Sequence, residues 1–299
     1  MIISNLAGGL GNQMFQYACG RSLSLELNQN LKFSKDMIHF YKNPHNGVEL
    51  NRIFELNLNL ASRFELAKTI GRFRSYPLAR KALEFNSFCK FRGPHFIIEP
   101  QFRYLCDLDH RARNGAYLQG YWQSERYFKK YSTIIKEDFN FKNLANITDI
   151  NNIKLAELIN KNNSLSIHIR RGDYVKNHKT YSIHGVCSKE YYFSAVKHIQ
   201  EKYSNLLIVA FSDDPDWVSR EIAPYFSKLI VVSHNKGLES YLDMWLMSLC
   251  KHNIIANSSF SWWAAWLNKN PFKIIIAPKN WFANKAENAD LLPPSWIRL

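Results

Sequence analysis

The chain has 299 residues, of which 46% are hydrophobic and 14% aromatic, and it carries a formal net charge of +14. This size and composition exclude a disordered or low-complexity protein and favour a well-packed protein of two domains. No apolar run reaches membrane-spanning length, no basic region and apolar segment form a signal peptide, and the five scattered cysteines suit a reducing compartment, so we expect a cytoplasmic protein.

The first predicted elements are a strand over Ile2–Asn5, a glycine-rich turn over residues 8–11 and a helix over Asn12–Leu27. The turn is not a dinucleotide fingerprint, because a methionine stands where the third glycine is needed. Asn12 and Gln13 lie at the helix entry, where their amides can hydrogen-bond a phosphate or a sugar. An ordinary tight turn in which Asn12 caps the helix is the alternative.

A basic and aromatic stretch follows over residues 63–92. It holds eight Lys or Arg residues, with only Glu65 and Glu84 as acids and with aromatic side chains between the charges. Such a stretch can contact an anionic membrane surface, or it can form a solvated helical face with an aromatic underside. Nucleic-acid binding is the least favoured of the three interpretations.

The second half of the chain alternates strands and helices. This order is typical of a right-handed, doubly wound parallel sheet. The predicted strands are Leu165–Ile169, Leu206–Phe211, Leu229–Val232, Ile254–Ala256 and Lys273–Ala277, and the predicted helices are Lys189–Tyr203, the residues from Pro215, Leu238–Lys251 and Phe260–Asn268. We therefore expect an α/β fold of two facing Rossmann-like domains with parallel sheets, divided into residues 1–155 and 156–299.

The strand over Leu165–Ile169 ends in charge. Its apolar and polar residues alternate, so that His168 and Arg170 share one face and Arg171 follows where the strand stops. Open α/β sheets bind ligands at the carboxyl ends of their strands, and a guanidinium group fits a phosphate in two-pronged fashion. We expect a diphosphate site here, the alternative being a surface pair between an arginine and Asp173.

Three further groups have side chains suited to a nucleotide. Ser212 and Asp213 follow a buried strand, where they can cap the next helix or accept hydrogen bonds from a nucleoside. Asp243 lies in an otherwise apolar helical turn, and guanine offers two adjacent donors to such a carboxylate, although a structural Arg or Lys would also satisfy it. The third group opens a helix, where it binds an anion or simply caps the helix. It consists of Asn257, Ser258, Ser259 and Phe260.

Two D-x-D triplets, at residues 107–109 and 214–216, match the pattern by which many sugar-nucleotide transferases hold Mn²⁺ or Mg²⁺. Such triplets arise often by chance, and the helix dipole explains Asp216 in a first helical turn. Because the arginine pair already supplies positive charge, we expect no metal and no resident cofactor.

Four blocks together resemble the bacterial α-1,2-fucosyltransferases that build O-antigen, which are relatives of the α-1,6- and protein O-fucosyltransferases. The blocks are residues 8–13, 168–174, 211–214 and 257–263. The resemblance implies a GT-B-type fold, GDP-β-L-fucose as donor, and inverting, metal-independent transfer to the 2-hydroxyl of a terminal β-galactoside.

The resemblance also implies roles for single residues. Arg170 and Asn12 would be catalytic, Arg170 at the β-phosphate and Asn12 at the sugar-phosphate. His168 and Asp243 would contact the guanosine, and Arg171 would support its loop. The other residues implied at the donor site are Gln13, Asp173, Phe211, Ser212, Asp213, Asn257, Ser258, Ser259 and Phe260. The base for the acceptor hydroxyl stays open among Asp173, His178 and His184.

The expected partners are GDP-fucose and a galactose-terminated oligosaccharide or lipid-linked glycan, with peripheral contact between residues 63–92 and an anionic membrane, and no nucleic acid. Two alternatives stay open. One is a metal-dependent transferase that uses another sugar nucleotide, and the other is a non-enzymatic basic protein that binds nucleic acid or membrane.

Overall fold

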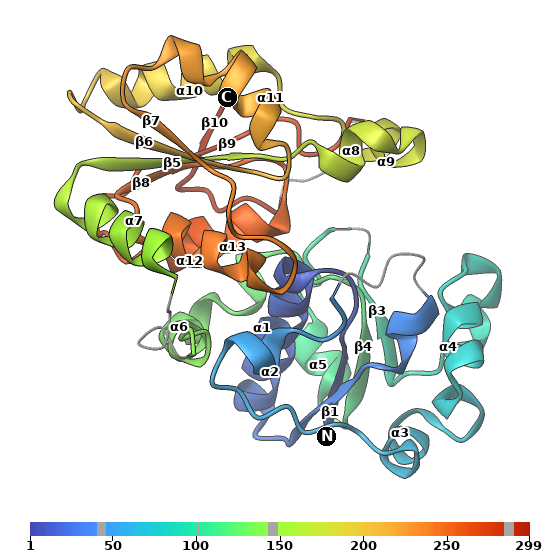
Figure 1. Ribbon diagram of the computed structural model, residues 1–299. Coiled ribbons are helices and arrows are strands. Elements are labelled where there is room, and N and C mark those ends of the chain that lie inside the picture. The colour runs from blue at the N-terminus through green and yellow to red at the C-terminus, as the bar shows by residue number, and fades with distance from the viewer. Residues whose placement is uncertain (41–45, 101, 143–148, 284–289) are drawn as a thin grey trace. The chain divides into compact units, whose positions relative to one another are not determined.

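The computed structural model describes residues 1–40, 46–100, 102–142, 149–283 and 290–299, and they form two α/β units (Figure 1). The first unit contains Met1–Lys142 with Asp290 and Leu291, and the second contains the rest of the described chain. The boundary drawn from the sequence at residue 155 falls inside α7 (Ile150–Lys161). The division lies before this helix because α7 packs on another helix of the second unit.

The sheet of the first unit has four parallel strands in the order β2-β1-β4-β3. The strands are β1 (Ile2–Asn5), β2 (Leu31–Ser34), β3 (Phe96–Ile98) and β4 (Ala116–Gln119). On one face, α1 (Leu10–Leu27) and α5 (Leu108–Ala112) bury apolar side chains against β1 and β4. On the other face, α3 (Arg63–Ile70) and α4 (Pro77–Leu83) do the same. The predicted first strand is confirmed, and the predicted helix begins two residues earlier, at Leu10.

The remaining helices of the first unit are short and lie in its connections. They are α2 (Leu50–Ile53), α6 (Ser132–Asp138) and the 3₁₀ turns η1 (Asp36–Phe40), η2 (Phe73–Ser75), η3 (Asn86–Phe91), η4 (Glu125–Tyr127) and η5 (Lys129–Tyr131).

The sheet of the second unit has six parallel strands in the order β10-β9-β8-β5-β6-β7. The strands are β5 (Ser164–Ile169), β6 (Leu207–Ser212), β7 (Leu229–Val232), β8 (His252–Ile254), β9 (Ile275–Ala277) and β10 (Ile297–Arg298). From β5 the chain builds outward to β6 and β7, then returns to the other side of β5 to add β8, β9 and β10. The order therefore reverses between β5 and β8, as in a Rossmann fold.

Helices cover both faces of this second sheet (Figure 1). On one face α10 and α11 bury apolar side chains against the strands. Figure 1 shows α7, α12 and α13 on the opposite face. The helices of the second unit after α7 are α8 (Gly172–Lys176), α9 (His178–His184), α10 (Lys189–Gln200), α11 (Pro215–Glu221), α12 (Tyr241–Leu249) and α13 (Ser259–Leu267), with the 3₁₀ turns η7 (Ala223–Tyr225) and η8 (Gly237–Ser240).

The predicted alternation of the second half is confirmed, with differences at its ends. The single helix expected over Leu238–Lys251 is a 3₁₀ turn, η8, followed by α12. The strand expected over Ile254–Ala256 is β8, which begins at His252. The two-residue strand β10 was not predicted, because it is too short to show a pattern and pairs only with β9.

The polar residues of β5 are buried as fully as its apolar ones. Leu165, Ile167 and Ile169 pack in the core beneath α10. On the other face, Asn253 donates a hydrogen bond of 2.7 Å from its side-chain amide to the Ser166 hydroxyl. Alternation in this strand therefore separates an apolar interface from a polar one, and the strand meets solvent only past its carboxyl end.

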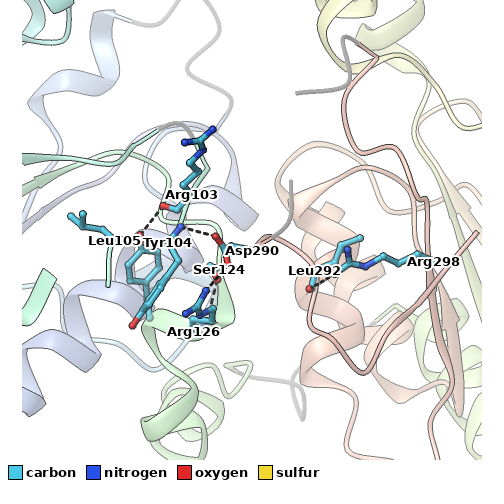
Figure 2. Close-up of polar contacts among 9 residues, drawn as sticks. Arg103, Tyr104, Leu105, Ser124, Arg126, Asp290, Leu292 and Arg298 are labelled. Atoms are coloured by element: carbon cyan, nitrogen blue, oxygen red, sulfur yellow. Dashed lines mark hydrogen bonds and ion pairs between the residues drawn. The ribbon is translucent and has the colours of Figure 1, made fainter. Parts of the chain in front are cut away.

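The last segment of the chain belongs to both units in turn. In the first unit, the Asp290 carboxylate accepts hydrogen bonds from the Tyr104 N–H at 3.0 Å and from Arg126 at 2.6 Å (Figure 2). In the second unit, Arg298 donates to the Leu292 carbonyl oxygen at 3.0 Å (Figure 2). These contacts fix the segment on either side of Leu291.

No helix in the described part of the chain is long and apolar enough to cross a membrane. All five cysteines are free thiols. Cys19 and Cys250 are buried, whereas Cys89 and Cys106 are exposed.

Candidate functional site

The candidate site lies at the carboxyl edge of the second sheet, where the strand order reverses between β5 and β8. Loops leave the two strands in opposite directions at such a reversal, which leaves a crevice where open α/β sheets bind ligands. Arg170 and Arg171 follow β5 here, and Asn257 and Ser258 follow β8. The predicted diphosphate residues of the second unit therefore come from two neighbouring strands.

Arg170 is held in place by a carboxylate of the neighbouring strand. The Asp213 side chain, at the end of neighbouring β6, lies 3.0 Å from the Arg170 guanidinium and also accepts the Arg171 N–H at 2.8 Å. The Arg170 side chain remains 30% exposed. A Cβ on Gly172 would lie 2.6 Å from an Asp213 carboxylate oxygen, so the absence of a side chain there permits this approach. Asp213 is thus positioned to orient Arg170.

Arg171 points into a different environment. Its guanidinium bonds Asp214 at 3.2 Å and lies 4.0 Å from the centre of the Trp217 ring on α11. Asp214 in turn caps α11 by accepting the Trp217 N–H at 3.2 Å, and Pro215 is the first helical residue as predicted. These contacts fit the loop-supporting role implied by the resemblance and place Asp214 as a helix cap.

His168 is almost fully buried near the carboxyl end of β5, and its ring centre lies 5.9 Å from that of Phe260. Its Nδ1 atom is buried without a hydrogen-bond partner among the described residues. Burial lowers the pKa of His168 to about 4, and the Arg170 charge acts in the same direction while Asp213 opposes it. The imidazole is therefore neutral at pH 7.

The start of α13 offers free hydrogen-bond donors to the same edge. Ser258 is the N-cap residue, but its side chain makes no capping bond, so the alternative of an ordinary side-chain cap does not describe it. The N–H groups of the first turn have no partners within the helix. Ser258, Ser259 and Phe260 are all partly exposed. This helix start can bind an anion through N–H groups and hydroxyls.

Asn257 is a buried support of the site. Its amide donates to the carbonyl oxygens of His184 at 2.8 Å and Trp281 at 3.2 Å, and its own carbonyl oxygen accepts from the Tyr174 hydroxyl at 3.3 Å. These bonds hold the end of α9 and the start of the 281–283 segment against the β8 edge. Asn257 acts on the site through the segments that it fixes.

A pocket of about 380 Å³ adjoins this support. Six of its lining residues are Tyr181, His184, Cys187, Tyr191, Asn257 and Phe282. The His184 ring stacks on Tyr174 at 4.9 Å, and Tyr174 in turn lies 5.5 Å from the Arg170 guanidinium. These two contacts connect His184 of the pocket wall with the Arg170 end of β5. Figure 1 shows α8 and α9 beyond this end of the strand.

Phe211 and Ser212, at the end of β6, contribute to packing and loop geometry. Phe211 is fully buried and lies beside His168 in the register of the sheet. The Ser212 hydroxyl accepts the Asp214 N–H at 3.0 Å. Phe211 and Ser212, both predicted as binding residues, therefore shape this edge through the residues that they contact.

Asp243 lies in the first turn of α12, where it accepts a 2.8 Å hydrogen bond from the side-chain amide of Asn235. Asn235 also exchanges two hydrogen bonds with Asn152, and His234 lies 3.0 Å from the same Asn152 oxygen. Burial raises the pKa of Asp243 to about 7, and the Asn235 donor opposes that rise. The side chain that bonds Asp243 in the structure is therefore an amide, where the alternative called for Lys or Arg.

In the first unit, Asn12 lies at the start of α1, which follows β1, and β4 is the neighbour of β1 in that sheet. Its side-chain oxygen accepts a 2.7 Å hydrogen bond from Gln123, which follows β4. This bond leaves the donor end of the Asn12 amide on the opposite side. Gly8 has φ +77°, and a Cβ there would lie 2.7 Å from that amide nitrogen. Gly8 thus makes room for Asn12.

Gln13 is fully buried and already bonded to the chain around it. Its amide donates to the carbonyl oxygens of Gly8 at 2.9 Å and Gly47 at 2.8 Å, and it accepts the Glu49 N–H at 3.0 Å. The structure therefore places Gln13 as a clamp between loops, with Asn12 as the more accessible of the two amides.

A partly buried carboxylate that the sequence analysis did not single out supports Gln123. Glu99, just past β3, accepts backbone hydrogen bonds from Tyr121 at 2.7 Å and Gln123 at 3.2 Å. Burial raises its pKa, and the backbone N–H donors of residues 121–123 oppose the rise. The sequence signal that could have revealed Glu99 is its position directly after one strand, together with the Gly-Tyr-Trp-Gln sequence at residues 120–123 directly after the next strand.

The structure bears on the candidate bases for the acceptor hydroxyl and on the expected absence of a metal. The side chain of Asp173 lies outside the described residues, His178 is exposed, and His184 lines the pocket. No group of three or more His, Cys, Asp or Glu residues that could hold a metal ion occurs among residues of known placement. In the D-x-D triplets, Asp107 pairs with Arg111 at 2.9 Å and Asp214 caps α11. Metal independence stays a prediction.

Comparisons with known proteins bear on the fold and the family. Among solved structures, the chain is similar to the NodZ α-1,6-fucosyltransferase, with a TM-score of 0.53 and 12% identity over 89% of this chain and 91% of that one. This likeness shows the fold. Two α/β units, each built on a sheet of parallel strands, define a GT-B-type glycosyltransferase fold, as the sequence analysis expected.

The family follows from sequence comparison. Residues 97–299 match the family model described as glycosyl transferase family 11. Two Escherichia coli proteins align over nearly their whole length. An α-1,2-colitosyltransferase is 35% identical, and the alignment covers 100% of this chain and 99% of that protein. The O-antigen biosynthesis glycosyltransferase WbnK is 33% identical, and the alignment covers 99% of each chain. A galactoside 2-α-L-fucosyltransferase of Caenorhabditis elegans is 23% identical over 97% of this chain and 77% of that protein. The chain belongs to glycosyl transferase family 11, and its predicted resemblance to α-1,2-fucosyltransferases is confirmed.

Proposed function

We propose that the chain transfers L-fucose from GDP-β-L-fucose to the 2-hydroxyl of a terminal β-galactoside, with inversion and without a metal, in the synthesis of O-antigen or another surface glycan. The observation that carries this proposal is the pairing of Arg170 with the start of α13 at the reversal between β5 and β8. A cation and free N–H groups that converge there suit a diphosphate.

The chemistry explains why these donors matter. As the glycosidic bond breaks, positive charge develops on the sugar ring and negative charge grows on the leaving diphosphate. Preorganised donors aimed at that growing charge lower the barrier. Arg170 serves this purpose at the β-phosphate, and the α13 N–H groups with Ser258 and Ser259 serve it beside Arg170. Asp213 keeps the Arg170 guanidinium oriented before the donor binds.

The same proposal assigns the other contacts. The neutral His168 and the carboxylate of Asp243 contact the guanosine, and Asn12 of the first unit donates to the sugar-phosphate. The partners are GDP-fucose and a galactose-terminated oligosaccharide or a lipid-linked glycan, with no nucleic acid. A cytoplasmic location and peripheral membrane contact through residues 63–92 remain predictions of the sequence.

The decisive experiment is turnover of GDP-fucose against a panel of β-galactosides, with the linkage and anomeric configuration of the product determined by NMR. We expect an α-1,2-fucosyl product from at least one acceptor, with activity retained in excess EDTA. Loss of activity in EDTA and rescue by Mn²⁺ would support the metal-dependent alternative. Absence of GDP binding by calorimetry would support the non-enzymatic alternative.

A second candidate function differs only in the sugar. The relative at 35% identity is named an α-1,2-colitosyltransferase, and colitose is L-fucose without its 3-hydroxyl. Comparison of kcat/KM for GDP-fucose and GDP-colitose on the same acceptor separates the two. A site that hydrogen-bonds the 3-hydroxyl discriminates strongly against the deoxy sugar, because its polar groups are then left unpaired. Preference for GDP-colitose would replace the fucosyl proposal and leave the diphosphate chemistry unchanged.

A further inference from the structure

The segment from α3 to η3 carries a concentration of exposed apolar side chains. Seven of the nine exposed large hydrophobic residues described in the first unit lie between residues 63 and 92. Two of them, Phe64 and Leu78, are 78% and 73% exposed. We call the seven the aromatic face: Phe64, Phe73, Tyr76, Leu78, Phe85, Phe88 and Phe91. Isolated exposed hydrophobic residues are ordinary, but a cluster marks an interaction surface.

Two arginines tie the elements of the aromatic face together. Arg74 donates to the carbonyl oxygens of Ile70 at 3.0 Å and Phe91 at 2.6 Å, which brings η3 to the end of α3. Arg92 donates to the Leu83 carbonyl oxygen at 2.9 Å, which fixes the same turn to the end of α4. Backbone anchored at both ends can present its aromatic side chains with little ordering cost on contact.

The exposed charges around the aromatic face are positive. Both acids of the segment are engaged: Glu65 pairs with Lys32 at 2.6 Å, and Glu84 pairs with Lys81 at 2.6 Å. Arg80 is fully buried and pairs with Asp36. The exposed cations that remain are Arg63, Lys68, Arg72 and Lys90. The sequence suggested eight cations for a partner, and the structure leaves four of them on the exposed surface.

We propose that the aromatic face docks on an anionic lipid bilayer. Its aromatic and leucine side chains enter the boundary between headgroups and acyl chains, and the four cations contact lipid phosphates. Charge favours this occupant over a second copy of the chain, since two such faces would oppose their cations. The exposed apolar area favours lipid over nucleic acid, whose phosphates would meet the aromatic side chains. The proposal is independent of the proposed reaction.

Sedimentation of the purified full-length chain with vesicles tests the proposal. Vesicles of phosphatidylcholine with 30% phosphatidylserine by preparation are compared with pure phosphatidylcholine, at low and high salt. We expect binding to the acidic vesicles that weakens with salt. Replacement of Lys68, Arg72 and Lys90 by Gln should weaken binding roughly 100-fold, at about 1 kcal/mol per cation. Phe64→Ser and Leu78→Ser should each weaken it about tenfold.

Matched controls change exposed residues outside the aromatic face. Phe272→Ser removes an aromatic side chain of the second unit that is 77% exposed, and Lys202→Gln with Lys269→Gln removes exposed charge there. These variants should bind vesicles like the unchanged chain. Circular dichroism establishes whether each variant is folded. If the triple variant does not fold, Phe64→Ser and Leu78→Ser test the proposal in its place.

Four results would overturn the proposal. They are equal binding to neutral and acidic vesicles, no binding to either, variants of the aromatic face that sediment like the unchanged chain, and a dimer in light scattering that Phe64→Ser dissociates. The last result would assign the face to a second copy. Binding of duplex DNA that the triple charge variant abolishes, without vesicle binding, would assign it to nucleic acid.

Discussion

At the carboxyl edge of the second sheet, a partly exposed arginine and the open start of a helix face solvent, whereas the corresponding edge of the first sheet is lined by amides that bond to one another and to the backbone. Arg170 has one carboxylate partner from β6 and remains partly exposed. Gln13 and Gln123 of the first unit are buried, with their amides engaged. The second edge lies where the strand order reverses, so topology provides a crevice there, and the side chains decide its ligand.

We propose that the two edges divide the chemical roles of the reaction. A diphosphate needs positive charge, and the second edge supplies it with Arg170 and helical N–H groups. In the proposed reaction the sugar-phosphate also takes a neutral donor at a fixed angle, and the first edge supplies it with Asn12, oriented by Gln123. We therefore expect substitutions in the second unit to change nucleotide chemistry, and substitutions in the first unit to change turnover with little effect on GDP affinity.

The largest effect should come from Arg170→Lys. Lysine keeps the charge but loses the planar fork, so we expect turnover to fall about 10²–10³-fold, the scale of losing one preorganised donor. GDP-fucose binding should weaken less, because the contact strengthens in the transition state. Single-turnover kinetics and calorimetry measure the two effects separately.

Arg171→Lys is the matched control for that measurement. Arg171 is occupied by Asp214 and Trp217, so its substitution should lower Tm with less than a tenfold change in turnover. A folded Arg170→Lys enzyme with near-normal turnover under chemistry-limited conditions would show that the leaving group is stabilised elsewhere. The placement of the active site at the β5 edge would then be wrong.

The second effect concerns the base of the nucleotide. Asp243→Asn replaces an acceptor by an amide whose donor end would oppose the guanine N–H groups, and loss of such a charged hydrogen bond is worth roughly 1.5–3 kcal/mol of GDP affinity. Asn235→Ala removes the neighbour but keeps the carboxylate, so it should bind GDP more tightly than Asp243→Asn does. Unchanged GDP affinity of Asp243→Asn by calorimetry would remove this residue from the site.

The pH dependence of the same group gives an independent measurement. Burial raises the pKa of Asp243 to about 7, so the folded protein holds this proton more tightly than the unfolded chain does. Its contribution to stability is complete below a pH of about 4 and is lost as the pH rises through 7. GDP affinity should rise over the upper part of that window, as the carboxylate forms. Asp243→Asn should abolish both trends, and a variant that retains them would locate the titration elsewhere.

A smaller effect is expected at Gly172. The methyl group of Gly172→Ala would lie 2.6 Å from the Asp213 carboxylate, which must then move and release Arg170. We expect turnover to fall roughly tenfold, part of the loss seen for one oriented donor. The double variant Gly172→Ala with Asp213→Ala should be no slower than Asp213→Ala alone, since the clash is then gone. Additive losses in this cycle would show that Gly172 acts independently of Asp213.

Much of the fold was predictable because its signals are local and strong. The apolar run that became β6 and the cap before Pro215 predicted both elements closely, since buried parallel strands and helix caps depend on adjacent residues. The alternation of strands and helices predicted the doubly wound sheet, and the GT-B-type fold is confirmed. β10 escaped prediction because its two residues are set by pairing with β9 rather than by any local pattern.

The site was less accessible to sequence reasoning, because its geometry depends on contacts between distant segments. The sequence placed Arg170 at the phosphate and offered Asp213 as a helix cap or a nucleoside contact, whereas in the structure Asp213 holds Arg170. Gln13 and Asn12 are adjacent, yet one is a buried clamp and the other is partly exposed, since the helix turns them in different directions. Gln123 carried no signal by itself, because its importance comes from a partner 111 positions away.

The smallest predicted effect belongs to Gln123, and it tests the first edge alone. Gln123→Leu removes the hydrogen bond that orients the Asn12 amide, a bond worth about 0.5–1.5 kcal/mol. We expect turnover to fall twofold to tenfold while GDP affinity by calorimetry stays unchanged. Gln123→Glu is the sharper variant, because a carboxylate accepts where glutamine donates and should turn the Asn12 amide around, with a larger loss than leucine causes. Asn12→Ala sets the limit that neither variant should exceed.

If leucine and glutamate both leave turnover intact while Asn12→Ala lowers it, Asn12 works without orientation by Gln123. If all three weaken GDP binding as much as turnover, the first edge contributes to the nucleotide site, and the division of roles between the two edges fails.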